Sequence, residues 1–371
     1  MLKRLYIDNY KCLVNFEFTP QRTQLFLGPN GAGKSAVFDV LWSLRRLISG
    51  EKKIPELPLF SALTLWERRE QQTFELEVEG NGGTYEYGLI VQHKREARQS
   101  YILAESLSFE DRPLLNFAEG GVTIYRETGQ VDAQFPFDSS QSAFVTILER
   151  SEHRLHRWFR DWVGQIQVVR PNPFDMISQS LQEEPRLNDN MTNFVSWYRH
   201  LVQETPELIE RLRRSLAEVW EGFQSIRLEK AGPSVRLLKV SLQNAAGGEG
   251  NYEVAFGDLS DGQRVLIALY TLMHFAERTS LPLVCIDEPE NFVSLAEIQP
   301  WLMGMCQTVE DRGAHVLFIS HHPELINYLA PQDAVVLRRP QGGPTRVVPF
   351  RSLPGSTLTP AETIARGWDG E

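Results

Sequence analysis

The chain has 371 residues, of which 42% are hydrophobic and 23% are charged, a composition typical of a globular protein with one large domain or two smaller ones. Lysine and arginine number 38 against 48 aspartate and glutamate residues, so the formal net charge is −10. This acidic balance argues against a surface that coats nucleic acid broadly, but it is compatible with a local basic groove.

Cysteine usage and hydropathy exclude several further classes. Cys12, Cys285 and Cys306 lie far apart without CxxC spacing, so neither a disulfide framework nor a zinc site is predicted. No apolar run approaches the ~18 residues that span a bilayer. Residues 1–16, MLKRLYIDNYKCLVNF, lack the apolar core of a signal peptide. The sequence therefore predicts a soluble, cytoplasmic protein without a membrane partner.

The first motif lies in FLGPNGAGKSAVFDVL, where Gly28 to Ser35 fit the pattern G-x-x-x-x-G-K-[ST]. TQLFLG before the motif predicts a buried strand, and apolar residues recur at helical spacing after it. In such a loop the backbone N–H groups wrap phosphates, the lysine reaches the β- and γ-phosphates, and the serine hydroxyl ligates Mg²⁺. A glycine-rich turn without a ligand is the disfavoured alternative. The predicted nucleotide-binding residues are Pro29, Asn30, Gly31, Ala32, Gly33, Lys34 and Ser35.

The interval between this loop and residue 260 contains two patterns. Apolar and polar residues alternate in TFELEVE, TYEYGLIV, ESLSFE and VTIYRE, which predicts an antiparallel sheet beside the nucleotide base. From residue 140 to 225 the pattern becomes helical, with Thr205 as an expected N-cap before Pro206 and Gly222 as an expected stop. Sustained heptads are absent, so we expect a compact helical lobe and no coiled coil.

One segment of this interval raises the question of nucleic-acid binding. Residues 149–162, ERSEHRLHRWFRDW, interleave four arginines with aromatic residues, but three acidic residues stand among them. A solvated amphipathic helix explains the segment better. HKREAR, residues 93–98, is more basic and is the expected tip of a hairpin. DNA binding is thus left open by the sequence.

A second glycine-containing motif, DLSDGQRVLIALYTLM, predicts a helix that begins just after Ser260. Val265 and Leu269 lie on its apolar face. Ser260 and Gly262 at a helix start form an anion site, and the phosphate loop already serves one bound nucleotide. We therefore expect this site to serve a nucleotide held by a second subunit. An ordinary capping serine is the alternative.

Two apolar strands further along the chain end in residues suited to hydrolysis. LPLVCIDEPEN reaches Asp287 and Glu288, and HVLFISHHPEL reaches His321 and His322. At the carboxyl edge of a parallel sheet, Asp287 suits the outer shell of Mg²⁺, and Glu288 can orient or deprotonate the attacking water. His321 can donate a hydrogen bond to a γ-phosphate oxygen, whereas capping of the helix at Pro323 explains His322 better.

The order of these motifs resembles that of the ABC ATPases over nearly the whole chain. The similarity is closest to a stand-alone bacterial branch allied to RecF, to the heads of structural-maintenance-of-chromosomes proteins, and to the ATPase half of OLD-family nucleases. LKRLYIDNYKCLVNFEF is similar to the first strand and adenine-side loop of that branch, with Asn9, Tyr10 and Lys11 at matching positions. LSDGQ resembles the signature motif, CIDEPEN resembles Walker B, and His321 occupies the switch-histidine position.

This resemblance implies a homodimer that sandwiches two ATP molecules with Mg²⁺, in which Ser35 and Asp287 bind the metal. Glu288 would be the hydrolytic base, assisted by His321. One subunit's Walker A would hold each ATP, and the other subunit's signature motif would cap it. Besides the phosphate loop, the implied nucleotide-binding residues are Asn9, Lys11, Ser260, Gly262 and Gln263.

Three positions depart from the related pattern or are ambiguous. After DEPEN the chain reads FVSLAEIQPWL where related ATPases often have a Leu-His-Pro stretch, and this segment is the D-loop that touches the other subunit. Asp261 replaces a small residue common in transporter signatures, as in the chromosome-associated branch. The expected glutamine loop is assigned to either Gln71 or Gln72.

The motifs together predict an α/β fold: an ABC-type P-loop ATPase head with a mixed sheet core, an antiparallel β-lobe and a helical insertion lobe. The expected parts are residues 1–140 with Walker A and the β-lobe, 141–225 as the helical lobe, and 226–371 with the signature, Walker B and switch histidine. Only 371 − 321 = 50 residues follow the switch histidine, too few for the Toprim nuclease domain of OLD-type proteins. A nuclease partner would therefore be a separate polypeptide.

Three functions are compatible with these motifs. The first is an ATP hydrolase that controls a DNA-directed partner, such as a nuclease in phage defence or DNA maintenance. The second is the ATPase subunit of a membrane transporter, which the long interval and the signature variant disfavour. The third is a scaffold gated by ATP without hydrolysis, which Glu288 disfavours.

Overall fold

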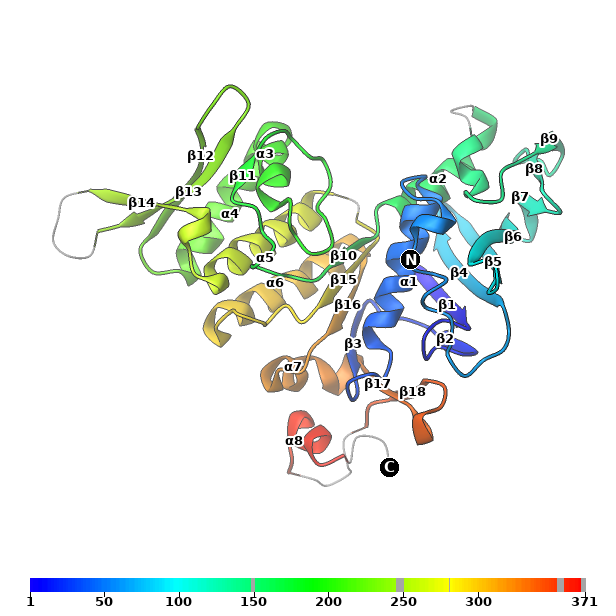
Figure 1. The fold of residues 1–371 in the computed structure, drawn as a ribbon. Coiled ribbons are helices and arrows are strands. Elements are labelled where there is room, and N and C mark those ends of the chain that lie inside the picture. Colours follow the sequence, from blue (N-terminus) through cyan, green and yellow to red (C-terminus); the bar gives the residue numbers. More distant parts are fainter. Residues whose placement is uncertain (148–150, 245–249, 280, 352–356, 368–371) are drawn as a thin grey trace.

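The computed structural model describes residues 1–147, 151–244, 250–279, 281–351 and 357–367. In these residues the chain forms a mostly parallel central sheet, an antiparallel sheet built by the N-terminal half, and a smaller antiparallel sheet beside a group of helices (Figure 1). The expected α/β head with a mixed sheet core, an antiparallel β-lobe and a helical lobe is confirmed. Within these ranges, no helix combines the length and apolarity needed to cross a bilayer.

The central sheet has the strand order β10-β15-β16-β3-β17-β18. The bounds of its strands are β3 Thr23–Leu27, β10 Gln167–Val169, β15 Leu283–Asp287, β16 His315–Ile319, β17 Ala334–Arg338 and β18 Arg346–Pro349. Neighbouring strands run parallel except β17 and β18, which run antiparallel. The carboxyl ends of β3, β15 and β16 therefore meet at one edge, and the predicted phosphate-loop, Walker B and histidine motifs follow these three strands.

Helices cover both faces of this sheet because its strands are apolar on both sides. Helix α1 (Lys34–Ile48) packs in a hydrophobic core that includes Cys285 of β15 and Leu317 of β16. Helices α5 (Asp261–Arg278), α6 (Leu295–Arg312) and α7 (Pro323–Asp333) pack in a second core, which includes the alternate strand residues Ile286 and Phe318. The short helix α8 (Pro360–Ala365) lies against α7. The central sheet thus separates two cores.

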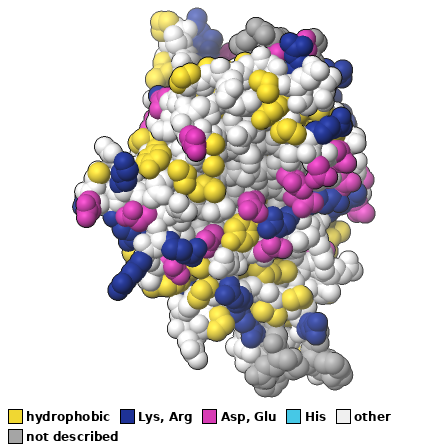
Figure 2. All heavy atoms as spheres, turned by 90° about the vertical axis from the view of Figure 1, so that its right-hand side faces the viewer, with side chains coloured by type: hydrophobic (Ala, Val, Ile, Leu, Met, Phe, Trp, Pro, Cys, Tyr) yellow, Lys and Arg dark blue, Asp and Glu magenta, His cyan; other side chains and the backbone are white. Residues whose placement is uncertain are grey.

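The N-terminal β-lobe is an antiparallel sheet in the order β2-β1-β4-β5-β6-β7-β8-β9. Its strands are β1 Leu2–Asp8, β2 Phe16–Phe18, β4 Gln71–Gly80, β5 Gly83–Lys94, β6 Gln99–Phe109, β7 Arg112–Ala118, β8 Gly121–Tyr125 and β9 Val131–Pro136. Alternate residues of β4 and β5 are buried, which matches the period of two in the sequence. Figure 2 shows the face of the molecule on this side, where basic and acidic side chains are interspersed.

The arginine- and aromatic-rich segment contains α2 (Arg154–Gly164), whose aromatic side chains serve the core. Phe159 and Trp162 are buried, and the ring of Trp158 stacks on Tyr85 of β5 with centroids 4.8 Å apart. The aromatic residues of this segment are therefore explained by packing within the protein. Glu149 and Arg150 of the same segment lie outside the described residues.

The predicted helical interval 141–225 divides between two parts of the molecule. Helix α2 packs on α1 beside the β-lobe, and β10 joins the central sheet. In the remainder, α3 (Phe194–Glu204) packs on α4 (Pro206–Val219), and α4 packs on α5. Next to these helices lies the smaller sheet, formed by β11 Gln179–Ser180, β12 Phe223–Lys230, β13 Arg236–Gln243 and β14 Asn251–Ala255.

Helix α4 begins and ends close to the predicted positions. Pro206 is its first residue, and Leu208, Leu212 and Leu216 are buried. The Thr205 side chain, however, does not cap the helix, because its hydroxyl donates to the carbonyl of Leu201 at 3.0 Å. The preceding helix α3 ends there, so the threonine serves that helix instead.

Candidate functional site

The phosphate loop connects β3 to α1 and is shaped by glycines with positive φ. Gly31 has φ 76° and Gly33 has φ 101°, values that L side chains rarely adopt. The first glycine, Gly28, faces β17 so closely that a Cβ there would lie 2.3 Å from the carbonyl oxygen of Leu337. Since the residue before α1 gives no side-chain cap, the N–H groups of the first turn face the loop. The loop is built for an anion at the helix N-terminus.

Lys34 is the first residue of α1 and bends back over this loop. Its ammonium donates to the carbonyl oxygens of Gly28 at 2.7 Å and Pro29 at 3.2 Å. Burial lowers the pKa of the Lys34 ammonium, while the nearby carboxylates of Asp287 and Glu288 act in the opposite direction. The loop carbonyls therefore hold the cation in place where phosphate oxygens could replace them.

A cavity of about 470 Å³ lies in front of the loop. The loop residues from Asn30 to Ser35 line it, together with Lys11, Glu288, His321 and Arg339, and with residues of the segment 61–66. This volume is within the range of small-molecule sites. Lys11 also forms an ion pair with Asp39 of α1, with Nζ and Oδ2 2.6 Å apart. The cavity thus gathers the phosphate loop and the ends of β15 and β16.

Ser35 and Asp287 provide two oxygen ligands beside each other. The Ser35 hydroxyl hydrogen-bonds the Asp287 carboxylate. Burial raises the pKa of Asp287, and the hydrogen bond from Ser35 and the charge of Arg170 act in the opposite direction. Mg²⁺ is usually bound through one or two protein oxygens, phosphate oxygens and water, and this pair next to a phosphate loop fits that chemistry. Full protein cages of three or more His, Cys, Asp or Glu residues were not found in the part of the chain that the structure describes.

Glu288 and His321 face each other at the ends of neighbouring strands. Glu288 Oε1 lies 3.9 Å from His321 Nε2, and both side chains are about half exposed. The Asn291 amide donates to Glu288 Oε2 at 2.7 Å. Glu288 has φ 51°, an uncommon conformation for a non-glycine residue that turns its side chain at the strand end. His322, by contrast, accepts a hydrogen bond from the backbone of Glu324 and caps α7.

Glu290 connects these two strand ends and was not singled out from the sequence. Its side chain is only 8% exposed, and Oε1 accepts from the Ser320 hydroxyl at 2.6 Å and from the backbone N–H of His321 at 3.1 Å. Its second oxygen, Oε2, is buried and has no hydrogen-bond partner among the residues that the structure describes. Glu290 therefore ties the loop after β15 to the loop that carries His321. A second glutamate two positions after Glu288, in the run DEPE, was the available signal.

Arg170 was also missed in the sequence. It follows β10 at the edge of the central sheet, and its guanidinium contacts Asp39 at 2.6 Å and Asp287 at 3.5 Å. Its backbone N–H donates to the carbonyl of Asp189 at 2.6 Å. The residue thus links the Walker B carboxylate to the segment that leads into α3. The strand before it is only three residues long, which is too short for a periodic pattern to reveal.

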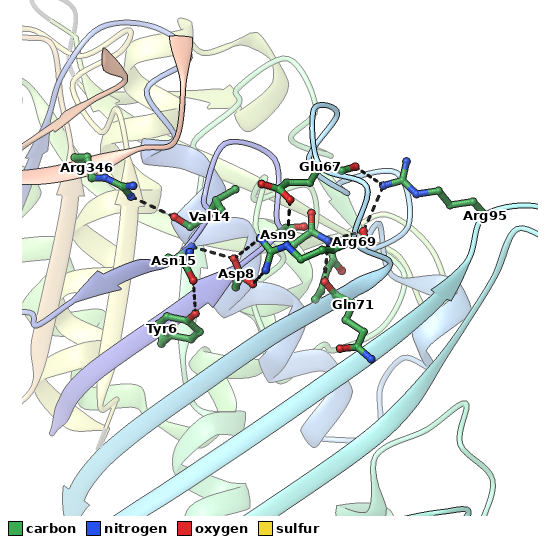
Figure 3. A network of polar contacts seen from close by, with 11 residues as sticks. Tyr6, Asp8, Asn9, Val14, Asn15, Glu67, Arg69, Gln71, Arg95 and Arg346 are labelled. Carbon is green, nitrogen blue, oxygen red and sulfur yellow. Dashed lines mark hydrogen bonds and ion pairs between the residues drawn. The ribbon is translucent and has the colours of Figure 1, made fainter. Parts of the chain in front are cut away.

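Asn9, predicted to bind the nucleotide, and the two glutamine-loop candidates do not line the cavity. Asn9 is fully buried, and its side-chain amide donates to the carbonyl oxygens of Arg69 at 2.9 Å and Gln71 at 2.8 Å, as Figure 3 shows. Gln71 and Gln72 lie in β4 of the β-lobe, and the Gln72 amide donates to the carbonyl of Asn9 at 3.0 Å. Tyr10 is buried as well. Tyr10, at the neighbouring position, does not line the cavity either.

The signature residues also lie apart from the phosphate loop of the same chain. Ser260 caps α5, where its hydroxyl accepts from the Gln263 backbone at 3.3 Å, and the Gln263 side chain accepts from the Ser260 backbone at 3.0 Å. A Cβ at Gly262 would lie 2.3 Å from the carbonyl oxygen of Phe292. Neither Ser260 nor Gly262 nor Gln263 lines the cavity. The N-terminus of α5 therefore packs on the segment after β15 and lies outside the cavity.

The fold and the site together define a P-loop ATPase head of the ABC type. The sequence matches the family described as "AAA domain, putative AbiEii toxin, Type IV TA system" over residues 25–327, and the chain belongs to this family. No match was found among curated proteins.

Solved structures with a similar fold include heads of SMC proteins. An SMC head bound to the C-winged helix domain of ScpA is 13% identical, with a TM-score of 0.58 over 94% of this chain and 97% of the other. The SMC head domain from Thermotoga maritima is 14% identical, with a TM-score of 0.51 over 95% and 99%. An Smc head with an extended coiled coil, bound to the C-terminal domain of ScpA derived from Pyrococcus furiosus, is 11% identical, with a TM-score of 0.52 over 94% and 95%. The SMC-head fold expected from the motif order is confirmed.

Proposed function

We propose that the protein binds ATP with Mg²⁺ and hydrolyses it between two copies of the chain. This proposal rests on one observation: in a single chain, the signature motif lies apart from the cavity with the phosphate loop. The cavity gathers Lys34, Ser35, Glu288 and His321, and Asp287 lies next to Ser35, while the signature serine does not line the cavity. A second copy can supply that serine from its own α5, as the resemblance to ABC ATPases implies. Cytoplasmic location fits this role.

The roles of the residues follow from their places in the cavity. Lys34 and the loop N–H groups bind the phosphates, and Ser35 and Asp287 hold the Mg²⁺, which neutralises charge on the β- and γ-phosphates. Glu288 accepts the proton of the attacking water, and His321 donates to a γ-phosphate oxygen. Ser260, Gly262 and Gln263 of the other copy cap the same phosphate.

Hydrolysis that needs two copies has a kinetic signature. We expect slow ATP turnover per chain at low protein concentration and a steep rise across the range in which light scattering detects dimers. Phosphate release should be measured at fixed ATP and Mg²⁺ over a wide range of protein concentration, with EDTA as the control that removes the metal. A rate per chain that stays constant across that range would contradict the shared site.

Glu290 provides a test of how the switch histidine is held. We expect Glu290→Ala to lower the rate constant of hydrolysis by about 10- to 100-fold, the range seen for partners that orient catalytic ligands, with a much smaller change in the ATP concentration at half-maximal rate. Glu290→Gln is the matched control, since its amide oxygen can still accept from Ser320 and from the His321 backbone. It should recover most of the rate. Equal losses in both variants would show that the hydrogen bonds to the switch loop are not what matters.

We further propose that ATP turnover controls a separate effector protein, such as a nuclease acting on DNA in phage defence or DNA maintenance. Two of the similar SMC heads are bound to ScpA, and the family description names a toxin of a type IV toxin–antitoxin system. Both support a head that works through a partner. A transporter subunit and a non-hydrolysing scaffold remain the competing functions, and co-purification with a membrane protein would favour the former.

A further inference from the structure

Two large apolar side chains stand exposed at the rim of the nucleotide cavity. Leu65 is 93% exposed and Trp66 is 46% exposed, and both line the cavity that contains the phosphate loop. They lie in the segment that leads into β4, which the sequence did not identify as part of the site. An exposed leucine and tryptophan at a ligand cavity are expected to be covered when the ligand is present.

Arg339 connects Trp66 to the phosphate loop. Its guanidinium carbon lies 5.1 Å from the centre of the Trp66 ring, a cation–π contact. The same guanidinium donates to the carbonyl of Gly31 in the phosphate loop at 3.2 Å and to the carbonyl of Gly343 at 3.0 Å. The indole is therefore held at a fixed place relative to the phosphate-binding backbone.

The chain just after Trp66 is anchored from behind by the network in Figure 3. Asn9 donates to the carbonyl of Arg69 at 2.9 Å, and Arg95 at the tip of the β5–β6 hairpin donates to the carbonyl of Glu67 at 2.9 Å. The Arg69 side chain in turn forms an ion pair with a buried carboxylate at the end of β1. These contacts restrain the rim segment on the β-lobe, so the indole is pre-positioned.

We propose that Leu65 and Trp66 bind the base of the nucleotide, on the proposed function that the phosphate loop binds its phosphates. The adenine-side position implied by family resemblance, Asn9, is buried behind this segment and acts as one of its anchors. Lys11 lies in the cavity but offers a charge to Asp39 and no apolar surface. The indole and the leucine together offer the apolar contact that a planar base needs. Every nucleobase has a π face that can stack on such a surface.

The test compares a ligand that has a base with one that lacks it. Calorimetric titration of Mg·ADP and of Mg·pyrophosphate avoids both turnover and closure around ATP. Trp66→Ala should weaken Mg·ADP about 5- to 100-fold, the range for loss of one aromatic–base stack, and leave Mg·pyrophosphate affinity unchanged. Trp66→Phe should recover most of the ADP affinity. The control Tyr252→Ala, an exposed aromatic residue of β14 outside the cavity, should change neither.

Several outcomes would overturn this assignment. Equal weakening of ADP and pyrophosphate by Trp66→Ala would show that the residue supports the phosphate loop and not the base. Unchanged ADP affinity in Trp66→Ala would show that Trp66 does not stack on the base. If ATP-dependent dimerisation of that variant fell at the same time, Trp66 would instead contact a second copy of the chain. The base subsite would also be rejected if the wild-type protein bound Mg·pyrophosphate as tightly as Mg·ADP, or more tightly. Failure to bind ADP, ATP and pyrophosphate altogether would instead reject the proposed function.

Discussion

Replacing Glu288 with glutamine is expected to reduce ATP hydrolysis by at least about 100-fold, since a positioned general base contributes roughly 10²- to 10⁴-fold to such a step. Glutamine keeps the size of the side chain and can still accept from the Asn291 amide, but it cannot take a proton from water. ATP binding should be retained, because the phosphate loop and the Ser35–Asp287 pair are untouched. The variant should therefore accumulate as an ATP-bound dimer, detectable by light scattering.

Glu310→Gln is the matched control, since it removes one exposed carboxylate from α6 at a distance from the motifs. It should hydrolyse ATP at the wild-type rate. The prediction fails if Glu288→Gln turns over ATP as fast as wild type, which would also favour a scaffold that does not depend on hydrolysis. If the variant traps the dimer as expected, a pull-down from its native lysate with ATP, analysed for both protein and nucleic acid, will identify the effector.

The individual strands and helices were predictable because the spacing of their apolar residues repeats within short stretches of sequence. Alternation in TFELEVE and TYEYGLIV corresponds to the buried residues of β4 and β5, and the leucines of α4 form its buried face. The partner of each face was not predictable. Helix α2 shows a helical pattern like α3, yet α2 packs on α1 and α3 on the other side of the central sheet. A periodic pattern reports which face is apolar but not which element covers it.

The same distinction applies to the candidate site. Lys34, Asp287 and His321 could be placed together because each lies at or after the end of a strand of one parallel sheet, whose carboxyl ends must meet. Arg170 and Trp66 could not be placed in the site from the sequence. Arg170 follows the short strand β10, and Trp66 lies in an irregular segment at the rim of the cavity. Glu290 acts through a hydrogen bond from Ser320 that joins residues 30 positions apart. Such contacts depend on the tertiary arrangement and leave no periodic trace in the sequence.

A mixture of two inactive variants is expected to recover hydrolysis that neither has alone. Lys34→Ala removes the phosphate-binding cation but keeps the signature helix. Ser260→Asp keeps an N-cap acceptor for α5 and places a negative charge where the signature would meet the γ-phosphate. In a symmetric dimer of one copy of each, one site carries both defects and the other carries none. With random pairing, half of the dimers are mixed, so about a quarter of the wild-type turnover should return.

Ser260→Asn separates the cap from the charge, because asparagine also caps helices but is neutral. It should retain far more activity than Ser260→Asp, and its mixture with Lys34→Ala should exceed the Ser260→Asp mixture. The measurement is phosphate release at a constant total protein concentration while the ratio of the two variants is varied, with a maximum expected at equal amounts. Both variants must be shown to fold by circular dichroism and to associate when mixed. If they associate and the mixture stays as inactive as its components, the phosphate loop of one copy does not work with the signature serine of the other.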